Sequence, residues 1–287
     1  MVDRIKANIT VLIKYLMAYW SSLSALACVW LAFISWDDMG ISGKLYRLLV
    51  LLSIFVVSAI LAVSTVLLRK RNKVFGDINK GLELRYGDIM KIGFPKKLSN
   101  KRIIVIPVNR CFDLSCDENL VSRKSIHGQW IEKFLSSNAQ QDDVHQYIQD
   151  VLEQRQVPFE LIEPCNKKSG YLRRYSPGTV VEIKGDNNIT YYLLALSKFD
   201  EDLKAYCSEI EFYKTLHGLV EYYDAHGQGE DLYCPIMGDH IARPIRNTSD
   251  IISFMVSFFR FNQKNIHGKV HIVVYNKMKS DISILDY

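Results

Sequence analysis

The chain has 287 residues and a formal net charge of +5, a length that suits one or two domains. The charge is uneven, because residues 1–73 carry nine basic and three acidic side chains, whereas residues 74–287 carry 27 basic and 28 acidic ones. The larger part therefore has no overall electrostatic attraction for nucleic acid, and we expect no nucleic-acid partner.

Two long stretches without a charged side chain lie near the N-terminus, at 15–36 and 48–68. Each has the roughly 20 residues that a helix needs to cross a bilayer. A cleaved signal peptide is the weaker interpretation of the first stretch, because its apolar core is too long and a second one follows at once. Basic side chains flank the pair at 4–14 and 69–73, so the positive-inside rule predicts a multi-pass protein of the cell (inner) membrane with both termini in the cytoplasm.

The predicted division is a transmembrane hairpin in 1–73 and one cytoplasmic domain in 74–287. In the second part, short Ile/Val-rich runs alternate with helical patterns, which favours an α/β domain built on a central sheet. Strands are expected at 101–109, 178–183, 189–197, 232–237 and 269–275, with residues 184–188 as a hairpin turn. Helices are expected at 119–135, 142–154, 200–226 and 248–263.

No metal and no cofactor are expected. The six cysteines form no CxxC pair and show no zinc spacing. The chain has no phosphate-binding GxxxxGK[ST] loop, no dinucleotide fingerprint and no hydrolase or kinase signature. No nucleophile is paired convincingly with a base, so no catalytic residue is predicted.

Polar side chains follow two of the expected strands, where α/β sheets bind their ligands. After the buried run at 103–108 come Asn109, Phe112 and Asp113; Phe112 could stack on an aromatic ligand. After 232–237, a glycine would let backbone N–H groups approach an anion, and an arginine could make a bidentate contact with phosphate. The residues of this second cluster are Gly238, Asp239, His240, Ile241 and Arg243. For His240, an ordinary surface turn is an equally good interpretation.

Two further segments carry candidate residues. In Gly87-Asp88-Ile89, a carboxylate held in a sharp turn can accept a hydrogen bond from an exocyclic amine, although Gly-Asp is also a common turn pair. At 127–128, Gly128 could allow a ligand to approach closely, whereas His127 is more commonly a packed or solvated helix residue.

The order of these motifs resembles the macro domain, which binds ADP-ribose. The matching motifs are YGDI at 86–89, IIVIPVN at 103–109, YSPGT at 175–179 and CPIMGDHIAR at 234–243. The resemblance implies a three-layer α/β/α domain with a mixed central sheet, in which Asp88 and Ile89 hold the adenine, Asn109 lies near the distal ribose and residues 238–241 hold the diphosphate. The ligand-binding residues predicted in this way are Asp88, Ile89, Pro107, Asn109, Phe112, Asp113, His127, Gly128, Gly178, Thr179, Gly238, Asp239, His240, Ile241 and Arg243.

A closer resemblance includes the two apolar stretches and covers nearly the whole chain. Together with VIPVNRCFD at 105–113, SIHG at 125–128 and PIMGDHIAR at 235–243, they look like the membrane effector of type II Thoeris antiphage systems. The resemblance implies that a TIR-domain partner makes a histidine–ADP-ribose conjugate from NAD. The macro-like domain then binds this ADP-ribose derivative, and the protein oligomerises and disrupts the membrane, which leads to cell death or growth arrest.

One departure from the macro-domain pattern affects the prediction of activity. Hydrolases of that fold carry a run of glycines after the asparagine, whereas residues 110–128 here are bulky and polar. We therefore expect a ligand-gated membrane effector rather than an enzyme, with residual hydrolase activity left open. The alternatives are a membrane-anchored ADP-ribosyl hydrolase, which would lose turnover on Asn109→Ala, and a structural anchor, which would tolerate Asp88→Ala.

Overall fold

The computed structural model describes residues 2–36, 38–40, 43–97, 100–116, 120–138, 140–167, 169–199, 204–237 and 247–287. Its internal contacts divide the chain into two compact units: 1–72 together with 277–287, and 73–276. The predicted domain 74–287 included the C-terminal residues, but residues 277–287 group with the N-terminal helices.

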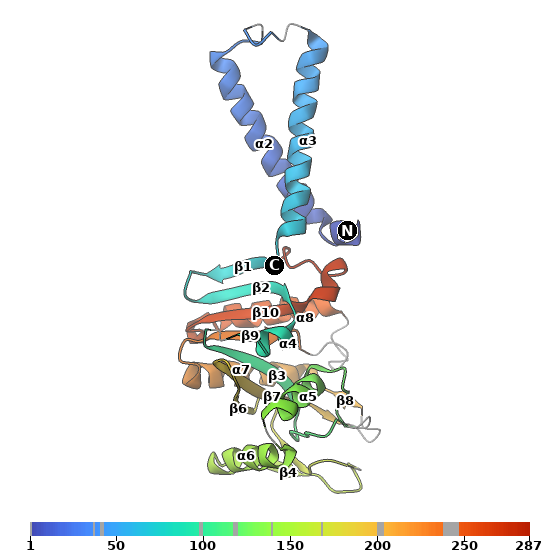
Figure 1. The fold of residues 1–287 in the computed structure, drawn as a ribbon, viewed down its shortest axis with the longest axis vertical. Helices are drawn as coiled ribbons and strands as arrows, with labels where there is room; N and C mark the ends of the chain where they lie inside the picture. Colours follow the sequence, from blue (N-terminus) through green and yellow to red (C-terminus); the bar gives the residue numbers. More distant parts are fainter. Residues whose placement is uncertain are drawn as a thin grey trace. The chain divides into compact units, whose positions relative to one another are not determined.

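The first unit contains two helices that are long and apolar enough to cross a membrane, by length and composition: α2 (Ile9–Phe33) and α3 (Lys44–Leu68). They pack on each other as a hairpin, preceded by α1 (Val2–Ala7) (Figure 1). The uncharged stretch predicted a helix at 15–36. The helix α2 begins six residues earlier and ends three residues earlier. Lys14 lies inside it, which its long apolar stem permits near a helix end.

The C-terminal residues pack on the base of this hairpin. The Ser283 hydroxyl donates to Asn8 Oδ1 at 2.6 Å, and Asn72 Nδ2 donates to the carbonyl oxygens of Ile284 at 2.9 Å and Tyr287 at 2.8 Å. Ile284 is fully buried. No local pattern in the sequence predicted this contact, because its partners are more than 200 residues apart.

The second unit is built on a mixed sheet, which confirms the predicted fold class. Within the described residues the sheet has eight strands in the order β1-β2-β10-β9-β3-β7-β6, with β8 paired to β7 (Figure 1). The parallel strands are β2, β10, β9, β3 and β7, whereas β6 and β8 run antiparallel to β7. The bounds are β1 Arg71–Gly76, β2 Gly81–Gly87, β3 Arg102–Asn109, β6 Val180–Lys184, β7 Ile189–Phe199, β8 Ala205–Tyr206, β9 Asp231–Pro235 and β10 Lys269–Tyr275. A separate antiparallel pair consists of β4 (Phe159–Leu161) and β5 (Arg173–Tyr175).

Helices cover both faces of the sheet. One hydrophobic core joins α4 (Ile89–Gly93), α5 (Ile126–Asn138) and α6 (Gln141–Gln154) to alternate residues of β3, including Ile104 and Ile106. The intervening residues of β3 point to the opposite face. There α7 (Glu209–His226) contacts β6 and β7, and α8 (Thr248–Phe261) contacts β2 (Figure 1). Two short 3-10 helices lie at Gln263–Asn265 and Asn276–Ser280.

The five strands and the hairpin turn predicted from the sequence are confirmed, but two helices begin later than expected. The helix α5 begins at Ile126, where the Ser125 hydroxyl accepts a hydrogen bond from Gly128 N at 3.0 Å. The helix α7 begins at Glu209, because Ser208 and Glu211 form a reciprocal capping box. In both cases a serine satisfies the first backbone N–H groups, so the helix begins at the cap rather than where apolar spacing begins.

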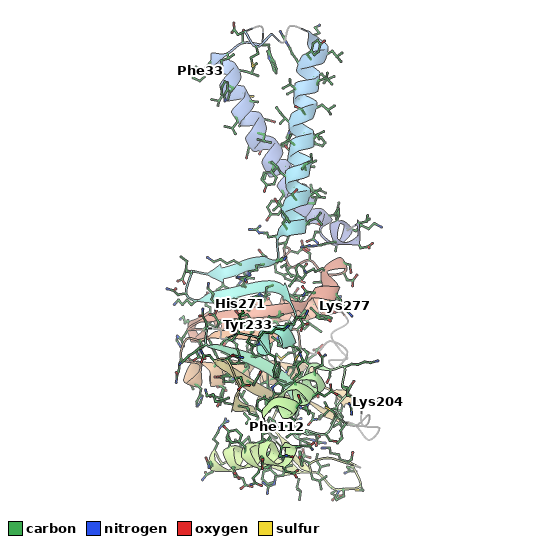
Figure 2. All side chains as sticks on the ribbon, viewed as in Figure 1. Phe33, Phe112, Lys204, Tyr233, His271 and Lys277 are labelled. Carbon is green, nitrogen blue, oxygen red and sulfur yellow. The ribbon has the colours of Figure 1, made fainter. Side chains whose placement is uncertain are left out.

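Charged and aromatic side chains of four strands meet on the face of the sheet. His271 of β10 stacks on Tyr233 of β9 at 4.3 Å between ring centroids (Figure 2). The His271 ring lies 3.5 Å from Glu83 of β2 through Nδ1 and 3.5 Å from Asp231 of β9 through Nε2. Two arginine guanidinium groups lie over the Tyr233 ring, from Arg85 of β2 at 5.5 Å and Arg102 of β3 at 5.7 Å.

This cluster predicts a pH dependence of stability. Burial disfavours the charged form of His271, but Asp231 and Glu83 outweigh that effect and raise its pKa above 6.5. The stabilisation is therefore fully present below pH 6.5 and is lost as the pH rises through the folded-state pKa. We expect the melting temperature to fall as the pH rises above 6.5, and to fall less in His271→Gln, as circular dichroism would show. An equal decline in both proteins would contradict the assignment. Burial lowers the pKa of His127 to about 3, so its neutral form is favoured in the folded state. Titration of His127 therefore lowers stability as the pH falls below 6.5, outside the range in which His271 titrates.

Candidate ligand-binding site

Three of the predicted segments leave the sheet at one edge. Asp88 follows β2, Asn109 ends β3, and the chain enters residues 238–246 from β9. These strands are parallel, with β10 and β9 between β2 and β3, so Asp88 and Asn109 are separated by about three strand spacings, on the order of 14 Å. The topology thus brings Asp88, Asn109 and the end of β9 to the edge at which α/β sheets bind ligands.

The predicted diphosphate-binding residues Gly238, Asp239, His240, Ile241 and Arg243 lie outside the described residues. Their roles stay predictions. The strand before them is described and ends at Pro235, two residues earlier than expected.

Asp88 is held by the helix that follows it. It is the N-cap of α4, and its Oδ1 accepts hydrogen bonds from Met90 N at 3.0 Å and Lys91 N at 3.3 Å. In the described part of the chain, no hydrogen bond to Oδ2 is found, and the side chain is only half-buried. A positioned carboxylate oxygen therefore remains for a ligand donor. Ile89, predicted beside it, is 6% exposed and belongs to the hydrophobic core.

The oxygen of the Asn109 amide group is occupied by hydrogen bonds within its own loop. Its Oδ1 accepts hydrogen bonds from Cys111 N at 3.1 Å and Asp113 N at 3.2 Å, next to an irregularity in the pairing of β3 with β7. The side chain is buried, and Nδ2 has no hydrogen-bond partner within the described residues. The donor end of the amide is thus the part that a ligand could use. Pro107, earlier in β3, is half-buried and lies in register with Leu194 of β7.

The structure does not fit the predicted stacking of a ligand on Phe112. This side chain is 0% exposed and packs edge-on against Tyr175, with the ring centroids 5.7 Å apart. Its backbone has φ of +53°, a left-handed conformation that is uncommon for residues other than glycine. The ring belongs to the hydrophobic core, so it offers no free face in this conformation.

Asp113 is also engaged by the protein itself. Its Oδ2 pairs with Lys167 Nζ at 2.7 Å, and its Oδ1 accepts from Tyr171 N at 2.6 Å. Both side chains of the ion pair are almost fully buried. The carboxylate therefore holds Lys167 and the backbone of Tyr171 rather than being presented to a ligand.

His127 and Gly128 lie in the first turn of α5 and are buried. Burial lowers the pKa of His127 to about 3, so its imidazole is neutral at pH 7. A Cβ on Gly128 would lie 2.3 Å from the Ser122 carbonyl oxygen, so glycine is needed there for contact with the protein's own backbone. The close approach predicted at Gly128 is made by residue 122 and not by an open ligand surface.

Gly178 and Thr179 form the turn before β6. The Thr179 hydroxyl donates to the Ser176 carbonyl oxygen at 2.8 Å, and Gly178 has φ of +88°. A Cβ on Gly178 would lie 2.5 Å from the carbonyl oxygen of Lys214 in α7. Both residues thus hold this turn against a helix.

The Gly178 contact gives a stability prediction. Gly178→Ala should cost about 1–3 kcal/mol more than Gly229→Ala, because both glycines have a positive φ but a Cβ at Gly229 would meet no atom nearer than 3.6 Å. Thermal unfolding of the two variants in parallel would measure the difference. Equal melting temperatures would show that the turn can move away from α7.

A pocket at the ends of β3 and β7 places the predicted Asn109 beside charged residues that are not among the predicted ligand-binding residues. Asn109, Arg110 and Lys198 line it, and Glu211 of α7 pairs with Arg110 at 2.9 Å and with Lys198 at 2.8 Å. Burial opposes the charged form of Glu211, but the bonds from Lys198 and Ser208 outweigh it and lower its pKa to about 2. In the sequence, the Ser208-x-x-Glu211 pattern indicates a helix cap and could have pointed to Glu211. No local pattern distinguishes Lys198 from an ordinary surface lysine.

The chain is similar to several known proteins. The family model described as the macro domain of the Thoeris protein ThsA matches residues 82–275. The Thoeris protein ThsA of Bacillus amyloliquefaciens (strain Y2) is 23% identical over 249 residues, which cover 85% of this chain and 78% of that protein. A solved mutant of an Oceanobacillus iheyensis macrodomain has a TM-score of 0.46 and 14% identity, covering 74% of this chain and 93% of that one. A second mutant, solved with ADPR, has a TM-score of 0.45 and 14% identity, covering 73% and 92%.

Proposed function

Because this chain belongs to the family of the Thoeris protein ThsA macro domain, we propose that it is a membrane effector of antiphage defence whose macro domain binds an ADP-ribose derivative. The proposed ligand is histidine–ADP-ribose, made from NAD by a TIR-domain partner. In this proposal the ligand is a signal rather than a cofactor.

The observation that carries the proposal is the placement of Asp88 and Asn109. Both lie at the carboxyl edge of the parallel strands, and each is held by its own loop through one polar atom, with a second polar atom unused within the described residues. Asp88 Oδ2 can accept from the adenine amine, and Asn109 Nδ2 can donate to a ribose oxygen. Between β2 and β3 in the sheet lies β9, which ends at Pro235, three residues before the predicted diphosphate-binding residues begin in the sequence.

The two apolar helices support a membrane location. Large apolar side chains along them are exposed, among them Phe33 at 85% and Leu68 at 76%. Contiguous apolar surface of this kind requires lipid or a partner to cover it. With the basic flanks, this favours insertion in the inner membrane with both termini in the cytoplasm.

A hairpin of two helices is too small to enclose a pore, so we propose that the effector acts as a homo-oligomer. A ligand can drive assembly only if it binds the assembled state more tightly than the resting one. Assembly would then disrupt the membrane and arrest the infected cell. The test is dye release from vesicles that contain the full-length protein: release on addition of histidine–ADP-ribose supports this step, and intact vesicles with bound ligand contradict it.

The chemistry near Asn109 supports binding rather than turnover. Burial raises the pKa of the Cys111 thiol, although Lys167 opposes the effect, so this sulfur stays protonated and a poor nucleophile. His127 is neutral and buried, and Asp113 is paired with Lys167. We therefore propose a non-enzymatic effector, and incubation with ADP-ribosylated protein would reveal any residual hydrolysis.

The decisive variant is Asp88→Asn in the full-length protein in lipid nanodiscs. Asparagine is an equally good N-cap, so α4 should stay in place while an N–H donor replaces the Oδ2 acceptor. We expect ADP-ribose and histidine–ADP-ribose to bind the wild type, and the variant to bind about 10–100-fold more weakly, because a hydrogen bond to a charged group is lost.

Isothermal titration calorimetry would measure both affinities, and the melting temperature would confirm that the fold is intact. Asp77→Asn is the matched control, because Asp77 also accepts backbone hydrogen bonds in a turn, from Asn79 N at 2.8 Å and Lys80 N at 3.0 Å. An absence of binding by the wild type, or equal affinities for Asp88→Asn and Asp77→Asn, would contradict the proposal.

A further inference from the structure

The helix α8 carries large apolar side chains on the face opposite the one it buries. The buried face consists of Ile251, Ile252, Met255, Val256, Phe258 and Phe259. On the outer face, Phe254 is 36% exposed and Phe261 is 89% exposed. The neighbouring helix α7 adds the exposed Ile210 and Tyr213, and the Tyr213 ring lies edge-on to that of Phe258, with the centroids 5.6 Å apart. Contiguous apolar surface of this kind marks an interaction site.

The outer face of α8 has the spacing of a contact between two helices. Asp250, Phe254, Ser257, Phe261 and Lys264 are all exposed, and they follow one another at alternating intervals of four and three residues. This is the interval at which a coiled-coil helix contacts its neighbour. The small serine in the middle would let the two helix backbones approach closely. We call these five residues the α8 seam.

The charges at the two ends of the seam indicate which helix fits it. The first turn of α8 carries Asp250, the last turn carries Arg260, and Lys264 lies in the 3-10 turn that follows. In the part of the chain that the structure describes, none of these three side chains forms an ion pair. A second α8 in parallel would bring like charges together, whereas an antiparallel one places each acidic end against a basic end. An anionic lipid surface would attract the basic end but repel Asp250.

We propose that the α8 seam is the contact surface for a second copy of this chain, with a two-fold axis at Ser257. About this axis, Phe254 packs on Phe261 of the second copy, and Asp250 faces its Lys264. The same contacts recur on the other side of the axis, as a two-fold interface requires. The inference rests on the proposed function, because it supplies the contact between copies that a homo-oligomer needs. One helix pair is small beside the roughly 1,200–2,000 Å² of a stable interface, so confinement of the copies to one membrane should favour the contact.

Disulfide cross-linking of the full-length protein in liposomes, without nucleotide, tests this surface. Ser257→Cys would place two thiols at the two-fold axis, close enough to form a disulfide. Ser136→Cys is the matched control, because Ser136 is an exposed serine of α5, outside the patch. The wild type controls for the exposed Cys28 and Cys165. We expect Ser257→Cys to give about 10-fold more covalent dimer than Ser136→Cys, because a specific contact raises the effective concentration of the thiols.

Charge reversal distinguishes a second copy from any other partner. All variants of this series also carry Ser257→Cys. Asp250→Lys alone, and Arg260→Glu combined with Lys264→Glu, should each reduce cross-linking about 10-fold, because like charges then meet at both ends of the seam. Mixing the two variants in the same liposomes should restore cross-linking between them, since each offers the charge that the other lacks. Asp143→Lys, in the first turn of α6, is the matched control for reversing a charge near a helix N-terminus, and melting temperatures report whether each variant is folded.

The outcomes separate this inference from the proposed function. Equal cross-linking at residues 257 and 136, or no recovery in the mixture, would overturn the two-fold contact. Cross-linking that falls with Arg260→Glu and Lys264→Glu but not with Asp250→Lys would assign the patch to anionic lipid instead. Cross-linking without dye release on addition of histidine–ADP-ribose would leave the contact surface in place and contradict the effector role. Dye release without cross-linking would do the reverse.

Discussion

Replacing Lys167 with methionine is expected to lower the free energy of unfolding by about 3–5 kcal/mol, the largest electrostatic effect predicted for this chain. The substitution would leave the Asp113 carboxylate charged and buried, since both side chains are no more than 2% exposed and their N–O distance is 2.7 Å. Transfer of a charge out of water is costly, and the Lys167 ammonium group is the charged partner that offsets that cost, beside the hydrogen bond from Tyr171 N.

Thermal unfolding of the full-length protein in detergent would measure this effect as a fall of roughly 6–20 °C in melting temperature. Lys184→Met is the matched control, because the Lys184 pair with Glu182 is exposed and should contribute less than about 1 kcal/mol. Combining Lys167→Met with Asp113→Leu should recover much of the loss, because no uncompensated charge then remains. Equal shifts for Lys167→Met and Lys184→Met would contradict the assignment.

The second large effect is expected for Trp130→Ala, at about 3–5 kcal/mol. Trp130 in α5 is fully buried, with its ring centroid 4.8 Å from that of Phe134 in a stacked arrangement and 5.8 Å from that of Tyr191 in an edge-on one. Its removal would leave a cavity between α5 and β7, and these neighbours would lose contacts that a close-packed interior cannot replace.

Circular dichroism is the suitable probe for this series, since the substitution removes a fluorophore. Trp130→Phe should cost clearly less than Trp130→Ala: it keeps an aromatic ring between the two neighbours and removes the indole Nε1, a buried donor with no partner in the described structure. Phe261→Ala serves as the surface control, because Phe261 is 89% exposed and should change stability by less than about 0.5 kcal/mol. A cost at Trp130 no larger than that at Phe261 would rule out this packing role.

The elements of the sheet could be predicted because their signals are local. The run at 103–108 and the run at 269–275 are short, rich in Ile and Val and bounded by turn residues, and both are strands. The turn at 184–188 also follows from local chemistry, since Asn187 and Asn188 adopt the positive φ angles that asparagine tolerates. The order of the strands was not predictable in this way, because β10 pairs with β2, from the opposite end of the domain.

The residues of the candidate site also divide into those that local signals predict and those that only the tertiary structure places. Asp88 was predicted from its sharp turn and the YGDI motif, and Asn109 from its place after the apolar run at 103–108; a parallel sheet places both at one edge. Phe112 and Asp113 follow the same strand and look equally suitable in the sequence, yet one ring lies in the core and one carboxylate pairs with a lysine 54 residues away. No local pattern distinguishes a polar residue that faces a ligand from one that neutralises a distant charge.

By itself, the amino-acid sequence determined the two apolar segments, the α/β alternation and the family, because hydrophobic periodicity and motif order are properties of the chain alone. Only the tertiary structure decided which charges are paired, which glycines are needed for internal packing and where a cationic pocket opens beside Asn109. The physical reason is that burial and charge pairing depend on residues that are distant in sequence, so they are set when the strands and helices pack together.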